Sequence, residues 1–329
     1  MGRRRVLVSA VTVMSTLAAC GGDGPSEPEV LLDFGDEAPG TNVALIAVEG
    51  PDGRTAEWID RLDGTIQRID IDEPGDPETV ATIEVGTDGE QRGLLGQTLI
   101  DGRRYAAWTK PAGLLGDFEI VVGEVVDGGE GEIVWSGGAA SGGAIGGVLD
   151  QYDGRILLGL GRNTGWDAET MVGGAMLLID PTGPPDQEGE ALSVGYTNPW
   201  AFTVTDDGAL WFADNAAGPD PDDPSVDDIE RVGRGDLIAD RNDVPRITDP
   251  SRAPTSMAEL PDGRLGICGF LDNELRAYEV VDTDAGSRTG LERAGTIMPC
   301  NLGVAVFDDG TIVTLAQGSD GETLQILRP

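Results

Sequence analysis

The stretch AFTVTDDGALWFA, residues 201–213, places two apolar runs on either side of an Asp207-Gly208 pair. Asp-Gly between apolar runs is typical of a β-hairpin, because glycine tolerates the positive φ of a primed turn. The same arrangement recurs along the chain, at Asp52-Gly53, Asp101-Gly102, Asp153-Gly154, Asp262-Gly263 and Asp309-Gly310. Successive pairs are 49, 52, 54, 55 and 47 residues apart, and a period near 50 indicates propeller blades.

Each repeat contains up to four strand-like runs. One precedes the turn, as at residues 43–48 and 302–307, and a second follows it, as at residues 105–108 and 265–268. Third runs tend to alternate between apolar and polar residues, as half-exposed strands do, and they lie at 65–71, 119–126, 175–179, 229–232, 275–281 and 323–327. Weaker fourth runs lie at 81–85, 133–135, 191–196, 246–248 and 294–298. Six such units predict an all-β, six-bladed β-propeller over residues 30–329.

The last unit ends at its third strand. The apolar run VLLDF, residues 30–34, is free to supply the missing strand. We therefore expect this N-terminal segment to close the ring, because such closure leaves no open sheet edge.

The N-terminus has the features of an export signal. Arg3, Arg4 and Arg5 precede an apolar run from Val6 to Ala19, which is shorter than the roughly 20 residues that a membrane-spanning helix needs. Small residues at its end predict a signal peptide over residues 1–19. The next residue, Cys20, resembles the acylated cysteine of a bacterial lipoprotein box; the alternative is an ordinary signal peptide followed by an unrelated cysteine. The export route, general secretory or twin-arginine, stays open.

A short tether follows the signal segment. Residues 20–29 are rich in glycine, proline and acidic residues, and they span roughly 30 Å at full stretch. We expect the propeller to lie close to a membrane through the lipid on Cys20. Its location would be the outer face of the cytoplasmic membrane or another extracytoplasmic membrane surface.

The chain is strongly acidic. Its formal net charge is −37 over 329 residues, and Lys110 is its one lysine. Such a surface repels nucleic acid and anionic lipid headgroups, so nucleic acid is excluded as a partner. The charge favours solubility in salt, and we expect a monomer.

Cysteine and histidine usage narrows the chemistry. Cys268 and Cys300 are a disulfide candidate in an oxidising compartment; the alternative is two buried free thiols. The sequence contains no histidine. This excludes histidine bases, histidine metal ligands and every Ser-His or Cys-His nucleophile.

A binding site is expected at the channel mouth, where the chain enters each innermost strand and leaves each second strand. The repeat places polar residues there: Arg61, Lys110, Arg162, Asn163, Asn198, Asp214, Asn215, Asp272, Asn273, Asn301 and Gln317. Convergent polar groups at one end of a channel favour a ligand site. The alternative is that loop positions are polar in any case.

Several segments resemble the glucose/sorbosone dehydrogenase family, quinoprotein sugar dehydrogenases built as six-bladed propellers. The similar segments are DRLDGTI at 60–66, GLLG at 93–96, YAAWT at 105–109, NPW at 198–200 and GALW at 208–211. Each motif is weak by itself, but their order and spacing together are specific and cover nearly all of the chain after Cys20.

The departures from the family pattern concern the chemistry. The family's general base is a histidine in His-x-Gly-Gly-x-Leu, and here the segment is AIGGVL, so Ala144 stands at that position. The arginine that helps to hold the quinone corresponds to Thr197. Sugar oxidation needs a base to take the hydroxyl proton while hydride leaves, and a methyl group cannot accept a proton. The resemblance thus implies no catalytic residue, and it speaks against retained pyrroloquinoline quinone (PQQ).

The resemblance also implies a calcium site. The family binds calcium partly through backbone carbonyls of a Gly-Pro loop, and the matching residues here are Asp214, Gly218, Pro219 and Asp228. Calcium takes six to eight oxygen ligands, which suits an acidic loop. The plainer interpretation of residues 216–228 is a solvated acidic loop.

Three functions follow from these observations. The leading hypothesis is a non-catalytic lipoprotein that binds a sugar-like small molecule or a protein at the channel mouth. One alternative is an active PQQ-dependent aldose dehydrogenase with a base other than histidine. The other is a surface scaffold for protein interactions that uses residues 216–228.

Overall fold

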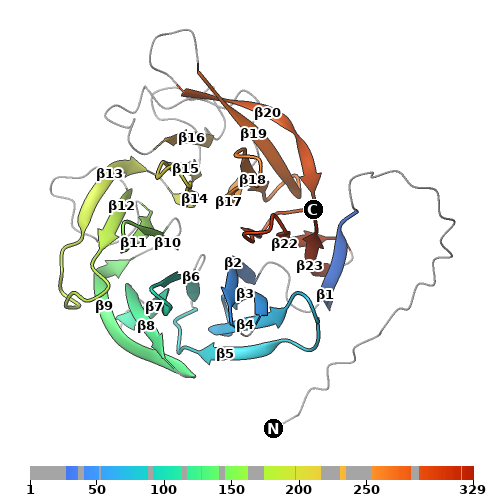
Figure 1. Ribbon diagram of the computed structural model, residues 1–329. Coiled ribbons are helices and arrows are strands. Elements are labelled where there is room, and N and C mark those ends of the chain that lie inside the picture. Colours follow the sequence, from blue (N-terminus) through green and yellow to red (C-terminus); the bar gives the residue numbers. More distant parts are fainter. Residues whose placement is uncertain are drawn as a thin grey trace, which may run out of the picture.

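The computed structural model describes residues 27–35, 41–51, 53–87, 92–112, 117–126, 128–140, 145–161, 174–196, 198–215, 230–234, 253–282, 289–319 and 321–329. Throughout these ranges the regular secondary structure is β-strand, and no helix is long and apolar enough to cross a membrane. The sheets are arranged radially around a centre, as in a β-propeller (Figure 1).

Five of the sheets have four antiparallel strands in the described residues. Two of them consist of β2 (Asn42–Gly50), β3 (Gly53–Asp60), β4 (Thr65–Asp70) and β5 (Glu78–Thr82), and of β6 (Leu94–Ile100), β7 (Arg103–Ala112), β8 (Asp117–Val126) and β9 (Gly129–Ala140). Two more consist of β10 (Gly146–Tyr152), β11 (Arg155–Leu160), β12 (Gly174–Ile179) and β13 (Glu190–Tyr196), and of β17 (Pro254–Glu259), β18 (Leu265–Gly269), β19 (Glu274–Asp282) and β20 (Thr289–Met298).

Between the β10–β13 and β17–β20 blades lies a sheet with three described strands: β14 (Pro199–Val204), β15 (Leu210–Asn215) and β16 (Glu230–Arg234). The fourth run predicted for this repeat, residues 246–248, lies outside the described residues. The strands β2, β6, β10, β14 and β17 all face the centre (Figure 1).

The ring closes through the N-terminal strand, as the sequence predicts. β1 (Glu29–Gly35) pairs antiparallel with β23 (Gly321–Leu327), beside β22 (Ile312–Gly318) and β21 (Gly303–Val306). The first and last strands of the described chain, β1 and β23, therefore share one blade (Figure 1).

The Asp-Gly turns are of two kinds, which corrects the expectation of primed turns throughout. Asp101 and Gly102 both have positive φ, 51° and 76°, as a type I′ turn requires. At Gly208, Gly263 and Gly310 the glycine alone is positive, at 80°, 79° and 88°. These three hairpins have longer connections, as at residues 205–209 between β14 and β15, so their aspartates keep ordinary φ values.

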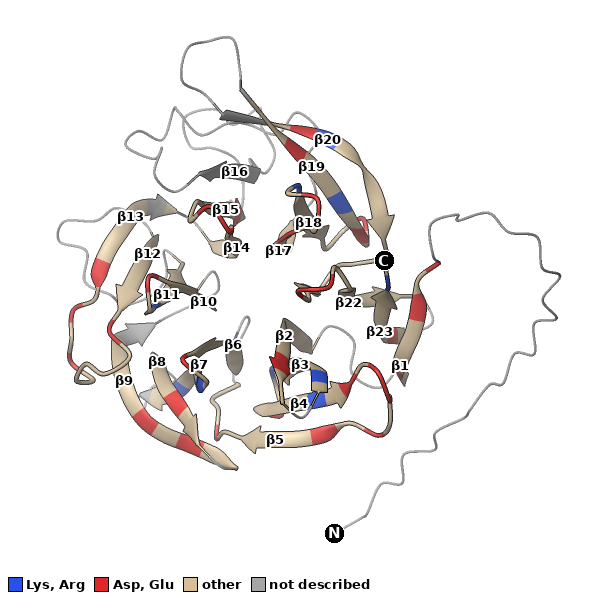
Figure 2. Ribbon diagram, in the orientation of Figure 1, with Lys and Arg blue, Asp and Glu red and all other residues tan. Residues whose placement is uncertain are grey.

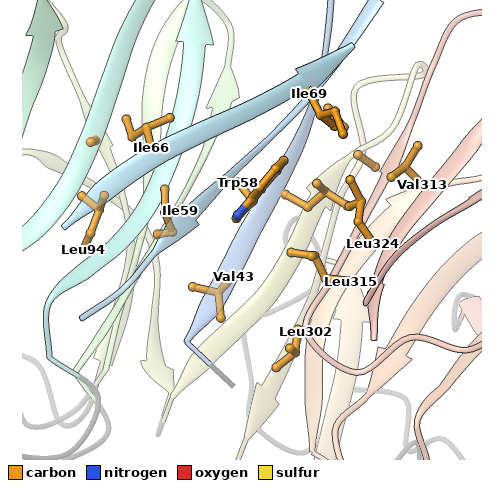
Figure 3. Packing of buried hydrophobic residues seen from close by; sticks show 14 of the residues in the cluster. Val43, Trp58, Ile59, Ile66, Ile69, Leu94, Leu302, Val313, Leu315 and Leu324 are labelled. Carbon is orange, nitrogen blue, oxygen red and sulfur yellow. The ribbon is translucent and has the colours of Figure 1, made fainter. Parts of the chain in front are cut away.

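The core lies at the seams between blades. Figure 3 shows Trp58 at one seam, with Ile59 and Ile66 on one side and Leu315 and Leu324 on the other. All five are buried. The strands at the seam are rich in β-branched and aromatic residues, which suits a pleated surface buried on both faces.

A disulfide joins Cys268 in β18 to Cys300, which lies between β20 and β21, with a Cα–Cα distance of 5.2 Å. This is the first of the two alternatives that the sequence left open. The bond closes a loop with a sequence separation of 32 residues, for which chain entropy gives about 3–4 kcal/mol of stabilisation.

Candidate functional site

Polar residues at the channel mouth bond to each other inside single blades. The backbone amide of Asn198 donates to Asp214 Oδ1 at 2.6 Å. In the closing blade, Asn301 Nδ2 donates to the Gln317 carbonyl at 3.1 Å, and the Gln317 amide donates back to Asn301 Oδ1 at 2.7 Å. Each bond links the start of an innermost strand to the end of the second strand, so these residues hold the mouth in shape.

The β6–β9 blade uses a threonine for the same purpose. The Gly93 amide donates to Thr109 Oγ1 at 2.8 Å, and that hydroxyl donates to the Gly86 carbonyl at 2.6 Å. Thr109 has no solvent exposure. The YAAWT motif thus ends in a residue that fixes two neighbouring loops.

Two predicted candidates carry charges that are neutralised within their own blades. Lys110 Nζ lies 2.9 Å from Glu130 Oε1. Asp272 forms an ion pair with Arg276, and both side chains are largely buried. Arg276 Nε also lies 2.9 Å from Glu274. Neither Lys110 nor Asp272 presents an uncompensated charge to a ligand.

Arg61 lies at the junction of the first two blades. Its Nη1 donates to the Arg92 carbonyl at 2.6 Å. Burial lowers the pKa of Arg61, and the nearby Asp60 raises it in part. The Arg92 guanidinium stacks 3.5 Å from the centre of the Phe118 ring, a favourable cation–π arrangement.

Two amide oxygens at the mouth are buried without a hydrogen-bond partner. They are Oδ1 of Asn198 and Oδ1 of Asn273. Asn198 directly precedes the first strand of the three-stranded sheet, and Asn273 follows β18 in the next blade. A buried acceptor without a donor is unfavourable by about 1–3 kcal/mol, so both oxygens are suited to receive hydroxyl or amide donors.

The remaining sequence candidates lie outside the described residues: Ala144, Arg162, Asn163, Thr197, Gly218, Pro219 and Asp228. Asn215 is the last residue of β15. In the described part of the chain there is no group of three or more His, Cys, Asp or Glu suited to a metal. Of the four calcium candidates, the structure places Asp214.

A cavity of about 270 Å³ lies in the channel, lined by residues of all the innermost strands. Asp150 of β10 contributes the one ionisable side chain among the described lining residues. Burial raises the pKa of Asp150 to about 6, and hydrogen bonds from the Gln151 and Val204 amides oppose this shift. Sequence reasoning missed Asp150, although an aspartate inside the apolar run VLDQY was a usable signal.

The described residues do not fit the quinone cofactor. An anionic quinone needs cations at its carboxylates, but Lys110 is paired with Glu130 and Arg276 with Asp272 and Glu274. Arg61 is partly buried at the junction of two blades, where its guanidinium donates to the Arg92 carbonyl. The wall of the central cavity carries a carboxylate and no Lys or Arg among its described residues.

The arrangement as a whole is that of an all-β propeller with a polar mouth above a narrow channel. Among solved structures it is similar to a protein of Thermus thermophilus assigned as an oxidoreductase (glucose dehydrogenase), at 22% identity and a TM-score of 0.66, covering 92% of this chain and 99% of that one. It is also similar to the soluble aldose sugar dehydrogenase of Escherichia coli in its apo form, at 19% identity and 0.65, with 92% and 99% covered. The PQQ-bound aldose sugar dehydrogenase of Streptomyces coelicolor matches at 17% and 0.60, with the same coverage.

These neighbours support a glucose/sorbosone dehydrogenase-like fold, in agreement with the resemblance found in the sequence. Searches with family models and against curated proteins give no match. At such identities the likeness concerns the fold and carries no activity over to this chain.

Proposed function

We propose that this chain is an exported, lipid-anchored propeller that binds a sugar-like ligand at its channel mouth and does not oxidise it. The observation that carries the proposal is the absence of histidine from the whole sequence, with Ala144 at the position of the family's base. A positioned base contributes about 10²–10⁴-fold to such a reaction. A chain that keeps the propeller framework and lacks the base is better suited to binding a sugar than to oxidising it.

The mouth supports a ligand with many hydrogen-bond donors. Asn198 and Asn273 lie on neighbouring sheets and each has a buried amide oxygen without a partner. Sugar hydroxyls are donors of the right kind, and a site built to bond them discriminates strongly against analogues that lack them.

The proposal includes three structural points. First, the β14–β16 sheet counts as a full blade, which makes six blades in the ring, and the spacing of the Asp-Gly pairs supports this. Residues 1–19 are a signal peptide, residues 20–29 a tether and residues 30–329 the propeller, with Cys20 acylated at an extracytoplasmic membrane surface. Asp214, Gly218, Pro219 and Asp228 are candidates for calcium ligands. The protein acts as a monomer and binds no nucleic acid.

The catalytic part is tested by incubating purified protein with PQQ, calcium, a panel of aldoses and a dye acceptor. We expect no turnover. Turnover at ordinary enzyme rates, about 1–10³ s⁻¹, would establish the alternative of an active dehydrogenase. The double variant Ala144→His, Thr197→Arg restores the family's base and its quinone-binding arginine. If this variant gains dehydrogenase activity, the framework is intact and the two missing side chains alone explain the lack of activity.

The binding part is tested with the same aldoses by calorimetry. Asn198→Ala and Asn273→Ala should each weaken binding by about tenfold or more, because each removes an acceptor at the mouth. Gln67→Ala in β4, whose amide bonds to Thr65 and Thr79, is the matched control and should bind normally. Equal binding by all three variants, or no aldose binding at all, contradicts the proposal and favours a protein partner.

A further inference from the structure

The central cavity lies below the mouth and has a chemistry of its own. It is formed by the innermost strands, and its described lining exposes polar and apolar atoms in about equal share, with Trp200 and Phe202 of β14 among the wall residues. Its volume of about 270 Å³ is at the small end for a ligand pocket, for which about 300–1,000 Å³ is usual. The cavity therefore suits a small molecule with an apolar part.

Two polar side chains of this wall, Asp150 and Gln97, have oxygens that can accept hydrogen bonds. Asp150 accepts from its neighbour, the Gln151 amide, at 2.7 Å and from the Val204 amide at 3.3 Å. No Lys or Arg of the described residues pairs with it, and its side chain remains partly exposed. Gln97 donates through Nε2 to the Ala44 carbonyl at 3.1 Å, while its Oε1 is buried without a partner.

Asp150 is also accessible from the opposite end of the channel. A second pocket, of about 320 Å³, is lined by residues 150–154 and 204–206 and shares Asp150 with the central cavity. Asp153 and Asp206 lie in this second pocket. Carboxylates at a channel end raise the local concentration of cations.

We propose that the central cavity binds a small organic cation, an alkylammonium group, with its charge on Asp150. An ammonium donates up to three hydrogen bonds, which Asp150 and Gln97 Oε1 can accept, and its alkyl part contacts the apolar and aromatic wall. A neutral molecule leaves the carboxylate uncompensated, and an anion is repelled by it. This site is separate from the mouth, and it does not depend on the proposed function.

Hydrogen bonds to Asp150 also have a structural role, because the Val204 amide joins β14 to β10. A purely structural role predicts a change in stability on substitution and no dependence on ligand. The test must therefore measure binding, and it must compare a cation with a neutral molecule of the same shape.

The experiment titrates the full purified chain with n-butylammonium chloride and, separately, with 1-butanol, calcium chloride and sodium chloride, by calorimetry at pH 8. We expect butylammonium to bind at least about tenfold more tightly than 1-butanol, since a charge-assisted hydrogen bond is lost in the alcohol. Asp150→Asn should weaken butylammonium binding by a similar factor. Asp76→Asn, between β4 and β5 and outside both pockets, should bind as the parent chain does.

A second variant, Gln97→Leu, removes the amide oxygen and should weaken butylammonium binding several-fold while leaving the apolar wall. Circular dichroism checks that each variant is folded. Equal binding of the alcohol and the ammonium to the parent chain overturns the proposal without any variant. Unchanged binding by folded Asp150→Asn overturns it as well, as does calcium binding by a chain that ignores butylammonium.

Discussion

Glu57 and Arg104 form an ion pair between neighbouring blades, joining β3 to β7. The Glu57 side chain is 2% exposed and the Arg104 side chain 16%. Burial raises the pKa of Glu57, and the charge of Arg104 lowers it in part. The buried Glu57 carboxylate depends on Arg104 for its stabilisation, because few water molecules can take the place of the arginine.

Replacing Arg104 with methionine should destabilise the protein by about 3–5 kcal/mol, since it leaves a buried carboxylate unpaired. Without the arginine the pKa of Glu57 rises further in the folded state, so stability falls as pH rises from the unfolded value of about 4.3. Urea denaturation at pH 5 and pH 8 measures both effects. The control is Arg103→Met, because Arg103 pairs with Glu124 on the exposed side of the blade; its denaturation midpoint should stay close to that of the parent chain. Equal losses in the two variants would contradict this account.

Asp150 offers a second test at this scale. Its pKa of about 6 exceeds the ordinary 3.8, so the unfolded chain releases this proton at lower pH than the folded one. The carboxyl therefore reduces stability as pH rises from about 4 to above 6, by at most about 3 kcal/mol. Asparagine can replace only one of the two oxygens that accept from the Gln151 and Val204 amides, so Asp150→Asn loses one of these bonds at every pH. Relative to the parent chain, the variant should gain up to about 3 kcal/mol of stability between pH 4 and pH 8. Thermal unfolding at both pH values checks this, and a stability difference that does not change with pH would contradict the pKa assignment.

At the scale of elements, strand positions were predictable because apolar runs and Asp-Gly pairs recur together. The outermost strands were less so. The sequence predicts a strand at residues 81–85, whereas β5 spans Glu78–Thr82. Ile83 is 2% exposed and its amide bonds to the Gly64 carbonyl, so this apolar residue packs into the core after the chain has left the sheet. Burial and strand pairing thus coincide less at the blade edge than inside it.

Close packing between strands predicts which glycines cannot be replaced. A Cβ on Gly123 of β8 would lie 2.6 Å from Cη2 of Trp108, a ring with no solvent exposure. Gly123→Ala should therefore destabilise by about 1–3 kcal/mol through overpacking. Gly50→Ala at the end of β2 is the control, because a Cβ there meets nothing within 4 Å. Denaturant midpoints of the two variants decide the matter, and equal midpoints would mean that Trp108 can move aside.

For the whole molecule, the repeat predicted the propeller and its closing strand, but not the use of the mouth residues. The side chains of Asn301 and Asp214 each fasten one blade, through bonds to the backbone of Gln317 and of Asn198. Sequence spacing shows that such residues meet at one end of the channel. It cannot show which of their atoms are already bonded, because that depends on side-chain geometry. Asp150 was not predicted because it lies within a strand, whereas the candidate residues were taken from loop positions. Acidic residues occur on every blade (Figure 2), so their distribution does not single out a binding site.

Ring closure depends on both ends of the chain. β1 covers β23, Arg328 donates to the Ile71 carbonyl at 2.7 Å, and Arg328 also lies 3.1 Å from Glu29. On the other side of the seam, Arg54 pairs with both Asp72 and Asp309. The last blade is thus fixed to the first by backbone pairing and by side chains.

Removing β1 should open this closure. A chain lacking residues up to Gly35 leaves the β23 edge unpaired, and an exposed edge of alternating buried residues is a template for pairing with another chain. We expect a lower thermal midpoint and concentration-dependent oligomers by light scattering. A chain lacking residues up to 26 keeps β1 and should remain monomeric with an unchanged midpoint, which separates the loss of the strand from the loss of the tether. If the chain without β1 is also monomeric and equally stable, β1 is an accessory strand and the packing between the last and first blades is enough to hold the ring.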